Sequence, residues 1–311
     1  MNLLIGAVTI GLILALLGLG VFVSYRIYHT LDLTADGAYG IGAAVAAALL
    51  VHGWSPFVAT FAAVLAGAVA GGITGLLRTK LMVNALLAGV LASTALYSVC
   101  LFVMGSGNLS LAATDHFGKL GERVGRGLFG LPETLTIAGD TVSGASIATL
   151  ILTALLVGGL AVALALFLGT ELGSAMRAAG NNPQMARAIA LDVDGMVVLG
   201  LCVSNGLVAL SGALFAQYSG FANIQMIIGA VVTGLANLML GEAVLGRRPL
   251  WRWIAGAVVG AVLFRLLVAA AVRAGLDPNA LKLVTAALVL AVLVPPRLSR
   301  RARRGEEAQR V

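Results

Sequence analysis

Long apolar runs, each ended by a short polar break, follow one another along almost the whole chain. Each run has about the length needed to cross roughly 30 Å of hydrocarbon as a helix. A β-barrel would instead alternate apolar and polar residues over about ten positions, and no such alternation is present. The pattern predicts an all-α integral membrane protein with about nine transmembrane helices (range 8–10), at residues 3–24, 37–53, 56–77, 82–104, 145–169, 196–217, 224–241, 253–273 and 279–296.

Composition supports a membrane protein over a soluble one. Hydrophobic residues make up 60% of the 311 positions and charged residues only 11%, whereas apolar usage in soluble domains is nearer one half. The first run has no basic residue ahead of it and no convincing small-residue cleavage site, so we expect a retained helix and not a signal peptide. Cys100 and Cys202 lie inside apolar runs and are expected to be buried small hydrophobes.

Basic residues suggest an orientation. With the N-terminus outside and the C-terminus inside, the outer connections hold only Lys119, Arg123, Arg126, Arg273 and Lys282, with Arg265 left within a helix. The positive-inside rule favours this arrangement, so the net charge of +7 reflects topology and nucleic-acid binding is not expected. The inner side would hold the other basic residues, at positions 26, 78, 80, 177, 187, 247, 248 and 252 and in the tail 297–311, which is expected to be a basic, lipid-facing extension.

The connections divide the predicted permease domain, residues 1–296, into recognisable parts. Residues 105–144 form a long outer loop that could hold one or two interfacial helices, and could dock a partner or cap the helix ends. The stretches from Asp36 and from Asn223 resemble each other weakly, which predicts inverted repeat halves at about 1–104 and 196–296, with chance similarity as the alternative. Glycines at every fourth position, at 67, 71 and 75 and at 256 and 260, predict close helix packing.

Polar residues at membrane depth are candidates for a translocation pathway. The breaks LDLTADG and SGFANIQ take corresponding places in the two halves, and broken helices can expose backbone dipoles to a cavity. Interfacial turns and interhelical hydrogen bonds are the alternatives. Arg265 is expected to need a partner or a water-filled crevice. The pathway candidates are Asp32, Thr34, Asp36, Gly37, Asn84, Asn205, Gln217 and Asn223.

Charges gather in the segment 170–195, between two apolar runs. We expect a helix from about Glu171, with Leu172, Met176 and Ala179 on one face. The residues Gly180 to Pro183 should end it and allow a second helix over 184–191. Such an element on the inner side could be received in a groove of a soluble partner.

This segment resembles the coupling loop of ABC importer permeases of the branched-chain amino acid and sugar permease family. The string ELGSAMRAAGNNPQMARAIALD follows the pattern G-x-x-x-R-A-x-G-x-N-x-x-x-A-x-x-x-G-I, with Ala190-Leu191 departing from Gly-Ile. Other blocks extend the resemblance from about Val8 to Leu293, and DLTADG is most similar to a subgroup named for tryptophan and tyrosine transport. By the resemblance, the ATPase-coupling residues are Glu171, Gly173, Met176, Arg177, Ala178, Ala179, Gly180, Asn182, Pro183 and Ala186.

The resemblance implies a type II ABC importer permease in the bacterial plasma (inner) membrane, in contact with lipid. It implies a second permease copy in a homodimer, a cytoplasmic ATPase dimer that carries ATP and Mg, and an outer substrate-binding protein. A small solute, an amino acid or a related and possibly aromatic compound, would pass inward by alternating access. No phosphate-binding loop is found, so this chain should be non-catalytic, without a cofactor or metal of its own. The alternative is a secondary transporter driven by an ion gradient, for which Asp32, Asp36 and Glu242 are the acidic candidates.

Overall fold

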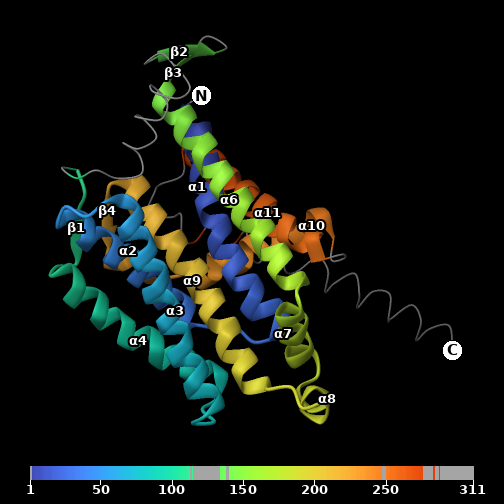
Figure 1. Cartoon of the computed structure of the whole chain (residues 1–311). Coiled ribbons are helices and arrows are strands. Elements are labelled where there is room, and N and C mark those ends of the chain that lie inside the picture. The colour runs from blue at the N-terminus through green and yellow to red at the C-terminus, as the bar shows by residue number, and fades with distance from the viewer. Residues whose placement is uncertain are drawn as a thin grey trace, which may run out of the picture.

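The computed structural model is a bundle of helices (Figure 1) and describes residues 2–112, 114, 134–137, 140–246, 250–275, 283 and 287. A π-helical turn, η1 (Val23–Ile27), extends the first helix, and a 3-10 turn, η2 (Ile224–Ile227), precedes α10. The α-helices are α1 (Asn2–Phe22), α2 (Thr34–Val51), α3 (Pro56–Thr79), α4 (Ala85–Met104), α6 (Gly144–Gly169), α7 (Glu171–Asn181), α8 (Pro183–Ala188), α9 (Val193–Ser219), α10 (Ala230–Leu245) and α11 (Leu250–Arg273).

The long apolar helices match the predicted crossings. In the described part of the chain, 7 helices are long and apolar enough to cross a membrane, which confirms the all-α membrane class. The predicted start at 224 was wrong, because Gly229 takes a φ of 90° and α10 begins only at Ala230. With 16 residues α10 spans about 24 Å, less than the hydrocarbon core. The run 279–296 lies outside the described residues apart from 283 and 287, so nine crossings stay a prediction.

Two pairs of short strands also form, in part from the described ends of the 105–144 loop; residues 115–133, where interfacial helices were expected, lie outside the described residues. β1 (Asn108–Ser110) pairs antiparallel with β4 (Phe221–Asn223), so the segment after α4 meets the segment after α9. β2 (Thr134–Ile137) and β3 (Asp140–Ser143) form a hairpin just before α6. The β1–β4 partners are far apart in sequence, which is why local pattern did not reveal them.

Helices from the two predicted halves of the chain are interleaved in the bundle. α9 packs on α2 and α3, while α1 packs on α10 and α11, and α1 and α9 touch at the centre. Each long central helix therefore lies against helices of the other predicted half. An inverted repeat would produce such an exchange, and the repeat itself stays a prediction.

Glycines allow the close approach of these helices, as their spacing predicted. A Cβ added at Gly71 would lie 2.1 Å from the carbonyl oxygen of Leu201 on α9, and one added at Gly75 would lie 2.8 Å from Cα of Val198. On α11, a Cβ at Gly260 would lie 2.0 Å from the carbonyl oxygen of Asn237. Backbones in direct contact replace side chains at these crossings, so the bundle core is tightly packed.

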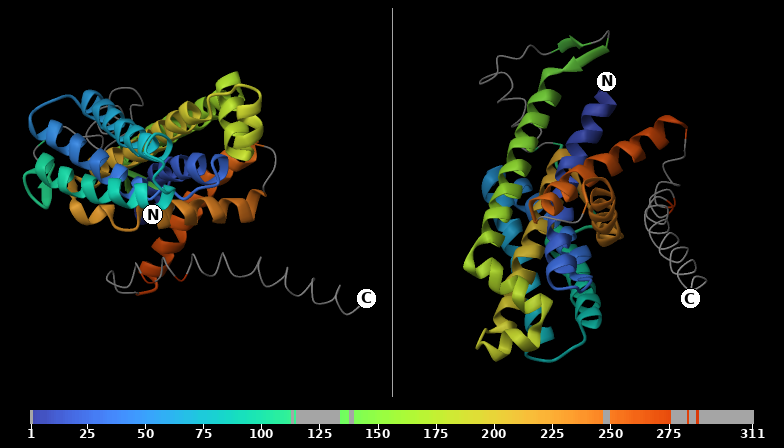
Figure 2. Two further views of the ribbon diagram at one scale, coloured as in Figure 1. Left: turned by 90° about the horizontal axis from the view of Figure 1, so that it is seen from below. Right: turned by 90° about the vertical axis from the view of Figure 1, so that its right-hand side faces the viewer.

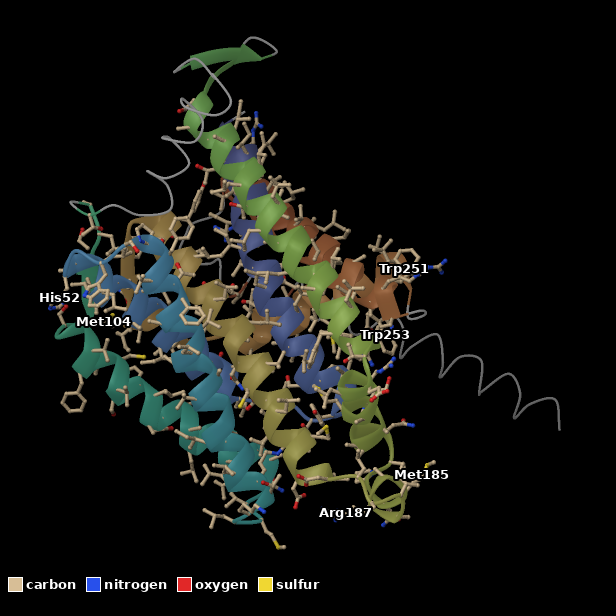
Figure 3. All side chains as sticks on the ribbon, viewed as in Figure 1. His52, Met104, Met185, Arg187, Trp251 and Trp253 are labelled. Atoms are coloured by element: carbon tan, nitrogen blue, oxygen red, sulfur yellow. The ribbon has the colours of Figure 1, made fainter. Side chains whose placement is uncertain are left out.

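The bundle has two different ends. α7, α8 and the α3–α4 turn lie at one end, and the β2–β3 hairpin and the start of α1 lie at the other (Figures 1 and 2). Arg187 on α8 marks the first end (Figure 3), and Lys80 follows the last residue of α3. Arg187 and Lys80, which the sequence assigned to the inner side, thus lie at the α7–α8 end, and the orientation itself stays a prediction.

Candidate functional site

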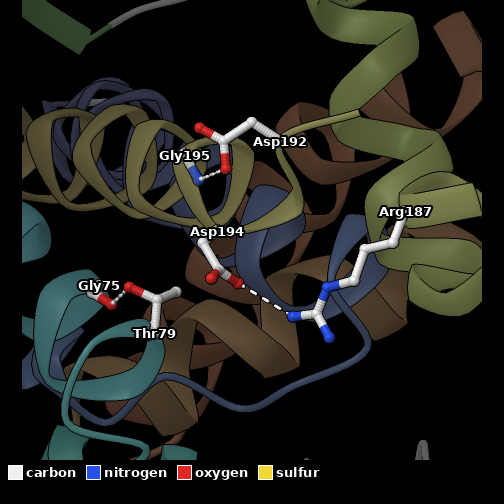
Figure 4. Close-up of polar contacts among 6 residues, drawn as sticks. All are labelled: Gly75, Thr79, Arg187, Asp192, Asp194 and Gly195. Carbon is white, nitrogen blue, oxygen red and sulfur yellow. Dashed lines mark hydrogen bonds and ion pairs between the residues drawn. The ribbon is translucent and has the colours of Figure 1, made fainter. Parts of the chain in front are cut away.

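Three polar side chains build the α7–α8 segment locally. Each accepts a hydrogen bond from a backbone N–H in the first turn of a helix and so satisfies one of its otherwise unpaired donors. The Thr170 hydroxyl caps α7 through Gly173 at 3.3 Å, and the Asn182 carbonyl caps α8 through Met185 at 3.0 Å. Asp192 caps α9 through Gly195 at 3.0 Å (Figure 4). The sequence thus encodes two short helices between the long ones.

One face of α7 is built into the bundle. Gly173, Met176 and Ala179 are buried, and Met176 joins a core cluster with Ile27, Tyr28 and Leu168. The prediction that Leu172 shares this face was wrong, since its side chain is 52% exposed. α7 packs against η1, α6 and α9. Its buried residues stand three positions apart and begin at Gly173, one residue after Leu172.

Two glycines set the depth at which α7 docks. A Cβ added at Gly180 would lie 1.9 Å from the carbonyl oxygen of Ile27, at the end of η1. A Cβ added at Gly173 would lie 2.4 Å from Cα of Leu168, at the end of α6. No larger residue fits either place without a backbone shift. α7 is therefore held directly against the backbone of two long helices.

Tyr28 links the same region to α9. Its hydroxyl donates a hydrogen bond to the carbonyl oxygen of Met196, and its ring fills the space that a side chain at position 200 would need, where the residue is glycine. Burial raises the pKa of the Tyr28 phenol well above its ordinary value, an effect that the nearby Arg78 guanidinium partly opposes. η1, α7 and α9 therefore meet at one buried joint.

α8 projects from the bundle and presents apolar side chains. Ala186 is buried against Ala179 and Val193, while Met185 and Ile189 are 62% and 65% exposed. Arg187 forms an ion pair with Asp194 at 3.1 Å, which ties α8 to the start of α9 (Figure 4). Sequence reasoning overlooked the exposed Met185 and Ile189, although apolar residues in an otherwise charged segment are a visible signal.

The second helix ends sooner than predicted. It was expected over 184–191 but α8 stops at Ala188, and Ala190 takes the left-handed conformation with a φ of 60°. This is the position at which the permease pattern has Gly. The departure noted in the sequence therefore falls where glycine is the residue best suited to the backbone.

Three of the predicted pathway residues form one buried polar network. The carboxylate of Asp32 accepts from the backbone N–H of Thr34 at 2.9 Å and from the Asn205 amide at 2.8 Å. The Thr34 hydroxyl is 2.9 Å from that of Thr74 on α3. All four side chains are at most 3% exposed, so the network joins α2, α3 and α9 in the interior of the bundle.

The other predicted pathway residues are dispersed. Gln217 donates to the Thr60 hydroxyl at 2.7 Å between α9 and α3, and Gly37 packs against Leu96 of α4. Asn84 and Asn223 cap α4 and η2 through their own neighbours. Their roles in transport stay predictions.

Asp36 contacts the start of α10, which lines an open cavity among the helices. Its carboxylate accepts from the backbone N–H of Val231 at 2.7 Å, in the first turn of α10. Gly229 and Ala230, at the start of α10, line a cavity of ≈ 480 Å³ together with Leu14, Leu17, Tyr39, Phe215, Gln225, Met226, Ile228, Val232, Thr233, Phe264, Arg265 and Val268. Its volume is that of a small-molecule pocket. We call it the aromatic cavity.

Arg265 is the charged side chain of the aromatic cavity. It makes no ion pair within the described part of the chain, and it lines an open cavity; whether water fills this cavity, as the sequence analysis expected in the absence of a partner, stays a prediction. Tyr39, Phe215 and Phe264 supply aromatic walls from α2, α9 and α11. Sequence reasoning missed these three because each stands in an apolar run with nothing local to distinguish it. As for metals, the described residues contain no group of three or more His, Cys, Asp or Glu side chains that could hold an ion.

A bundle of membrane-length helices with broken segments, a cavity among these helices and a projecting helical pair is the architecture of a multi-pass membrane permease. Residues 3–293 match the family described as "Branched-chain amino acid transport system / permease component". The chain belongs to this family, and it is a transport permease subunit, not an enzyme.

Two relatives match nearly the whole chain. The "Tyrosine transport system permease protein" of Clostridioides difficile (strain R20291) is 33% identical over 296 residues, covering 95% of this chain and 92% of that protein. The "Uncharacterized protein RP368" of Rickettsia prowazekii (strain Madrid E) is 30% identical over 289 residues, covering 91% and 94%. The likeness therefore extends over the described bundle and is not confined to the α7–α8 segment.

Proposed function

We propose that this chain is the membrane subunit of an ATP-driven importer, and that α7 and α8 receive the force of a separate ATPase pair that binds ATP and Mg. The observation that carries this proposal is the projecting α8, with Met185 and Ile189 exposed beside a rigidly docked α7. Exposed apolar side chains at the centre of a patch are the usual anchors of a protein interface. A second copy of the chain and an outer binding protein complete the assembly, in a bacterial plasma membrane.

Force applied to α8 would reach the helices that surround the cavity. Gly180 touches the backbone of η1, which continues α1, and Tyr28 ties η1 to α9. α1 and α9 contribute Leu14, Leu17 and Phe215 to the aromatic cavity. A displacement of α7 therefore has a route of direct backbone contact to the cavity walls, which supports alternating access.

The aromatic cavity supports an aromatic amino acid as the substrate. The relative of this chain from C. difficile is named for tyrosine transport. Arg265 could pair with the substrate carboxylate, and Tyr39, Phe215 and Phe264 could contact its ring. Import of tyrosine or a close relative is therefore the substrate proposal.

The test is reconstitution of the full-length chain in vesicles with the candidate ATPase and binding protein. Met185→Asp on α8 combined with Ile189→Asp, directly after it, places two charges on this exposed surface, while the control Gln184→Glu changes an exposed neighbour. We expect ATP hydrolysis and tyrosine uptake to fall at least tenfold in the double variant and to persist in the control.

The same vesicles separate the proposal from its rival. Uptake by the wild type driven by an ion gradient, with no ATPase present, would refute an ATP-driven importer and support the secondary transporter. Full hydrolysis and uptake by the Met185→Asp, Ile189→Asp variant would instead remove α8 from the ATPase contact.

A further inference from the structure

We propose that a second cavity, lying between η1, α7 and α11, binds the phosphate group of an anionic phospholipid. We call it the basic cavity. It has a volume of ≈ 390 Å³ and is separate from the aromatic cavity. The proposal does not depend on the ATPase or on the substrate.

The polar wall of the basic cavity consists mainly of donors. Arg26 and His29 come from the end of η1 and the connection after it, and Arg177 comes from α7. Arg26 is paired with Glu242 of α10 through both carboxylate oxygens, and Glu242 does not line the cavity. The side chains of Ser174 and Asn181 complete the polar wall.

Arg177 supplies positive charge that the described residues leave uncompensated. Its Nε donates to the carbonyl oxygen of Gly173 at 3.4 Å and its Nη2 to the hydroxyl of Ser174 at 3.0 Å, and both acceptors are neutral. No ion pair of Arg177 occurs in the described part of the chain. A guanidinium has five N–H donors in a planar fork, which suits phosphate oxygens.

Trp253 gives an independent sign of a missing acceptor. It lines the basic cavity from α11, and its Nε1–H is buried without a hydrogen-bond partner among the described residues. Figure 3 shows Trp253 beside the region where α7 meets the bundle. Buried indole N–H groups usually have an acceptor, and leaving one unpaired costs about as much as a lost hydrogen bond. An oxyanion bound in the cavity would supply an acceptor to the Arg177 guanidinium, and to the indole N–H of Trp253, whose residue lines the same cavity.

The remaining wall favours a lipid over a free phosphate ion. Ile27, Leu250 and Trp253 present apolar surface beside the donors, as an acyl chain and glycerol would require. Two of them stand at the first turn of a membrane-length helix, α11, and Ile27 ends another span. Basic pockets between such helices at one membrane face suit lipid head groups, and tryptophan side chains favour the membrane–water interface.

A lipid in this place would connect α7 to α11. Arg177 lies on α7, and Trp253 lies on α11, which also carries Arg265 of the aromatic cavity. An occupied site would stiffen the joint between the docked helix and the bundle. Anionic lipid would then regulate how α7 moves.

Native mass spectrometry of the full-length protein tests the proposal. Dioleoylphosphatidylglycerol and dioleoylphosphatidylcholine are titrated separately, and the apparent Kd of the first bound lipid is measured. We expect the wild type to prefer phosphatidylglycerol about tenfold. Arg177→Gln should abolish that preference, and Trp253→Phe, which keeps an aromatic ring but removes the N–H, should weaken it about fivefold.

Arg187→Gln is the matched control, because Arg187 is also a basic residue of this end but pairs with Asp194 outside the cavity. It should bind phosphatidylglycerol like the wild type. Equal affinity in the wild type, Arg177→Gln and Trp253→Phe would overturn the site. Displacement of the bound lipid by millimolar inorganic phosphate would overturn the lipid as its occupant and assign the site to a soluble anion. Should Arg177→Gln fail to fold, the Trp253→Phe result decides.

Discussion

Single residues in the α7–α8 region are fixed by backbone geometry more than by side-chain chemistry. Gly180 has its place because the Ile27 carbonyl leaves no room for a Cβ, and Gly200 because the Tyr28 ring lies there. Ala190 is the exception, since it holds a conformation that glycine adopts more readily. Substitutions at these positions have predictable signs.

Ala190→Gly should stabilise the protein. An L-residue in the left-handed region carries strain of about 1–2 kcal/mol, partly offset by the greater freedom of an unfolded glycine, so we expect a net gain of about 0.5–1 kcal/mol. Thermal unfolding in detergent measures the shift. Ala188→Gly, at the end of α8 itself, is the control and should lower stability, and a lower midpoint for Ala190→Gly would contradict the strain argument.

Tyr28→Phe should change the response to alkaline pH. Folding raises the pKa of the Tyr28 phenol above its ordinary 10.0, so the phenol stays protonated in the fold while the unfolded chain ionises. Its contribution to stability is therefore complete below pH 10 and is lost as the pH rises through the folded pKa. Between pH 8 and pH 11, the thermal unfolding midpoint should fall further for the wild type than for Tyr28→Phe. Equal falls would show that this phenol ionises as freely in the fold as in the unfolded chain.

At the scale of elements, the sequence predicted the long helices well because their signal is local. Eight predicted crossings have counterparts, most with ends that differ by a few residues; the break predicted at 31–37 is shorter than expected, because α2 already begins at Thr34. The start of α10 and the β1–β4 pair were missed, because Gly229 and the partners Asn108 and Asn223 take their roles only in the assembled bundle.

The helix α7 was anticipated from the amphipathic segment that starts at about Glu171 and from its family pattern, but its buried stripe was placed one residue early at Leu172. Amphipathic periodicity gives a stripe only approximately, and the neighbours η1, α6 and α9 decide its edge. The aromatic cavity was not predicted as a unit. Its walls come from five α-helices and from η2, and of the residues that line it only Arg265 was singled out by itself in the sequence.

Gly180→Ala should loosen the joint between α7 and η1. The added methyl group meets the Ile27 carbonyl, and such overpacking costs about 1–3 kcal/mol. Gly169→Ala is the control, since nothing lies within 4 Å of a Cβ at that position. We expect a lower unfolding midpoint and reduced coupling of ATP hydrolysis to uptake for Gly180→Ala alone. Matching midpoints and coupling in the two variants would contradict the close docking of α7 on η1.

In the whole molecule, a projecting helical pair lies at one end, and the aromatic cavity lies among the long helices of the bundle. α1 and α9 run between them, packed on helices of the opposite predicted half. This arrangement allows a push at α8 to change the walls of the aromatic cavity without unfolding either helix.

Arg265→Gln should reduce uptake of a carboxylate-bearing substrate. Loss of a charge-assisted pair costs about 1.5–3 kcal/mol, so we expect tyrosine uptake to fall about tenfold or more. Assembly of the variant with the ATPase should be unchanged. Arg273→Gln, at the exposed end of α11, is the control. Unaltered tyrosine uptake by Arg265→Gln would exclude Arg265 from substrate binding.

The most direct test of the central claim is site-specific photocrosslinking in the assembled, transport-competent complex. A benzophenone side chain is placed at Met185 on α8 or at the exposed Ser106, between α4 and β1, where β1 pairs with β4 beyond the end of α9 remote from α8. We expect Met185 to crosslink to the ATPase and Ser106 to give no such product. A crosslink to the ATPase from Ser106, or none from Met185 in an active complex, would contradict the account.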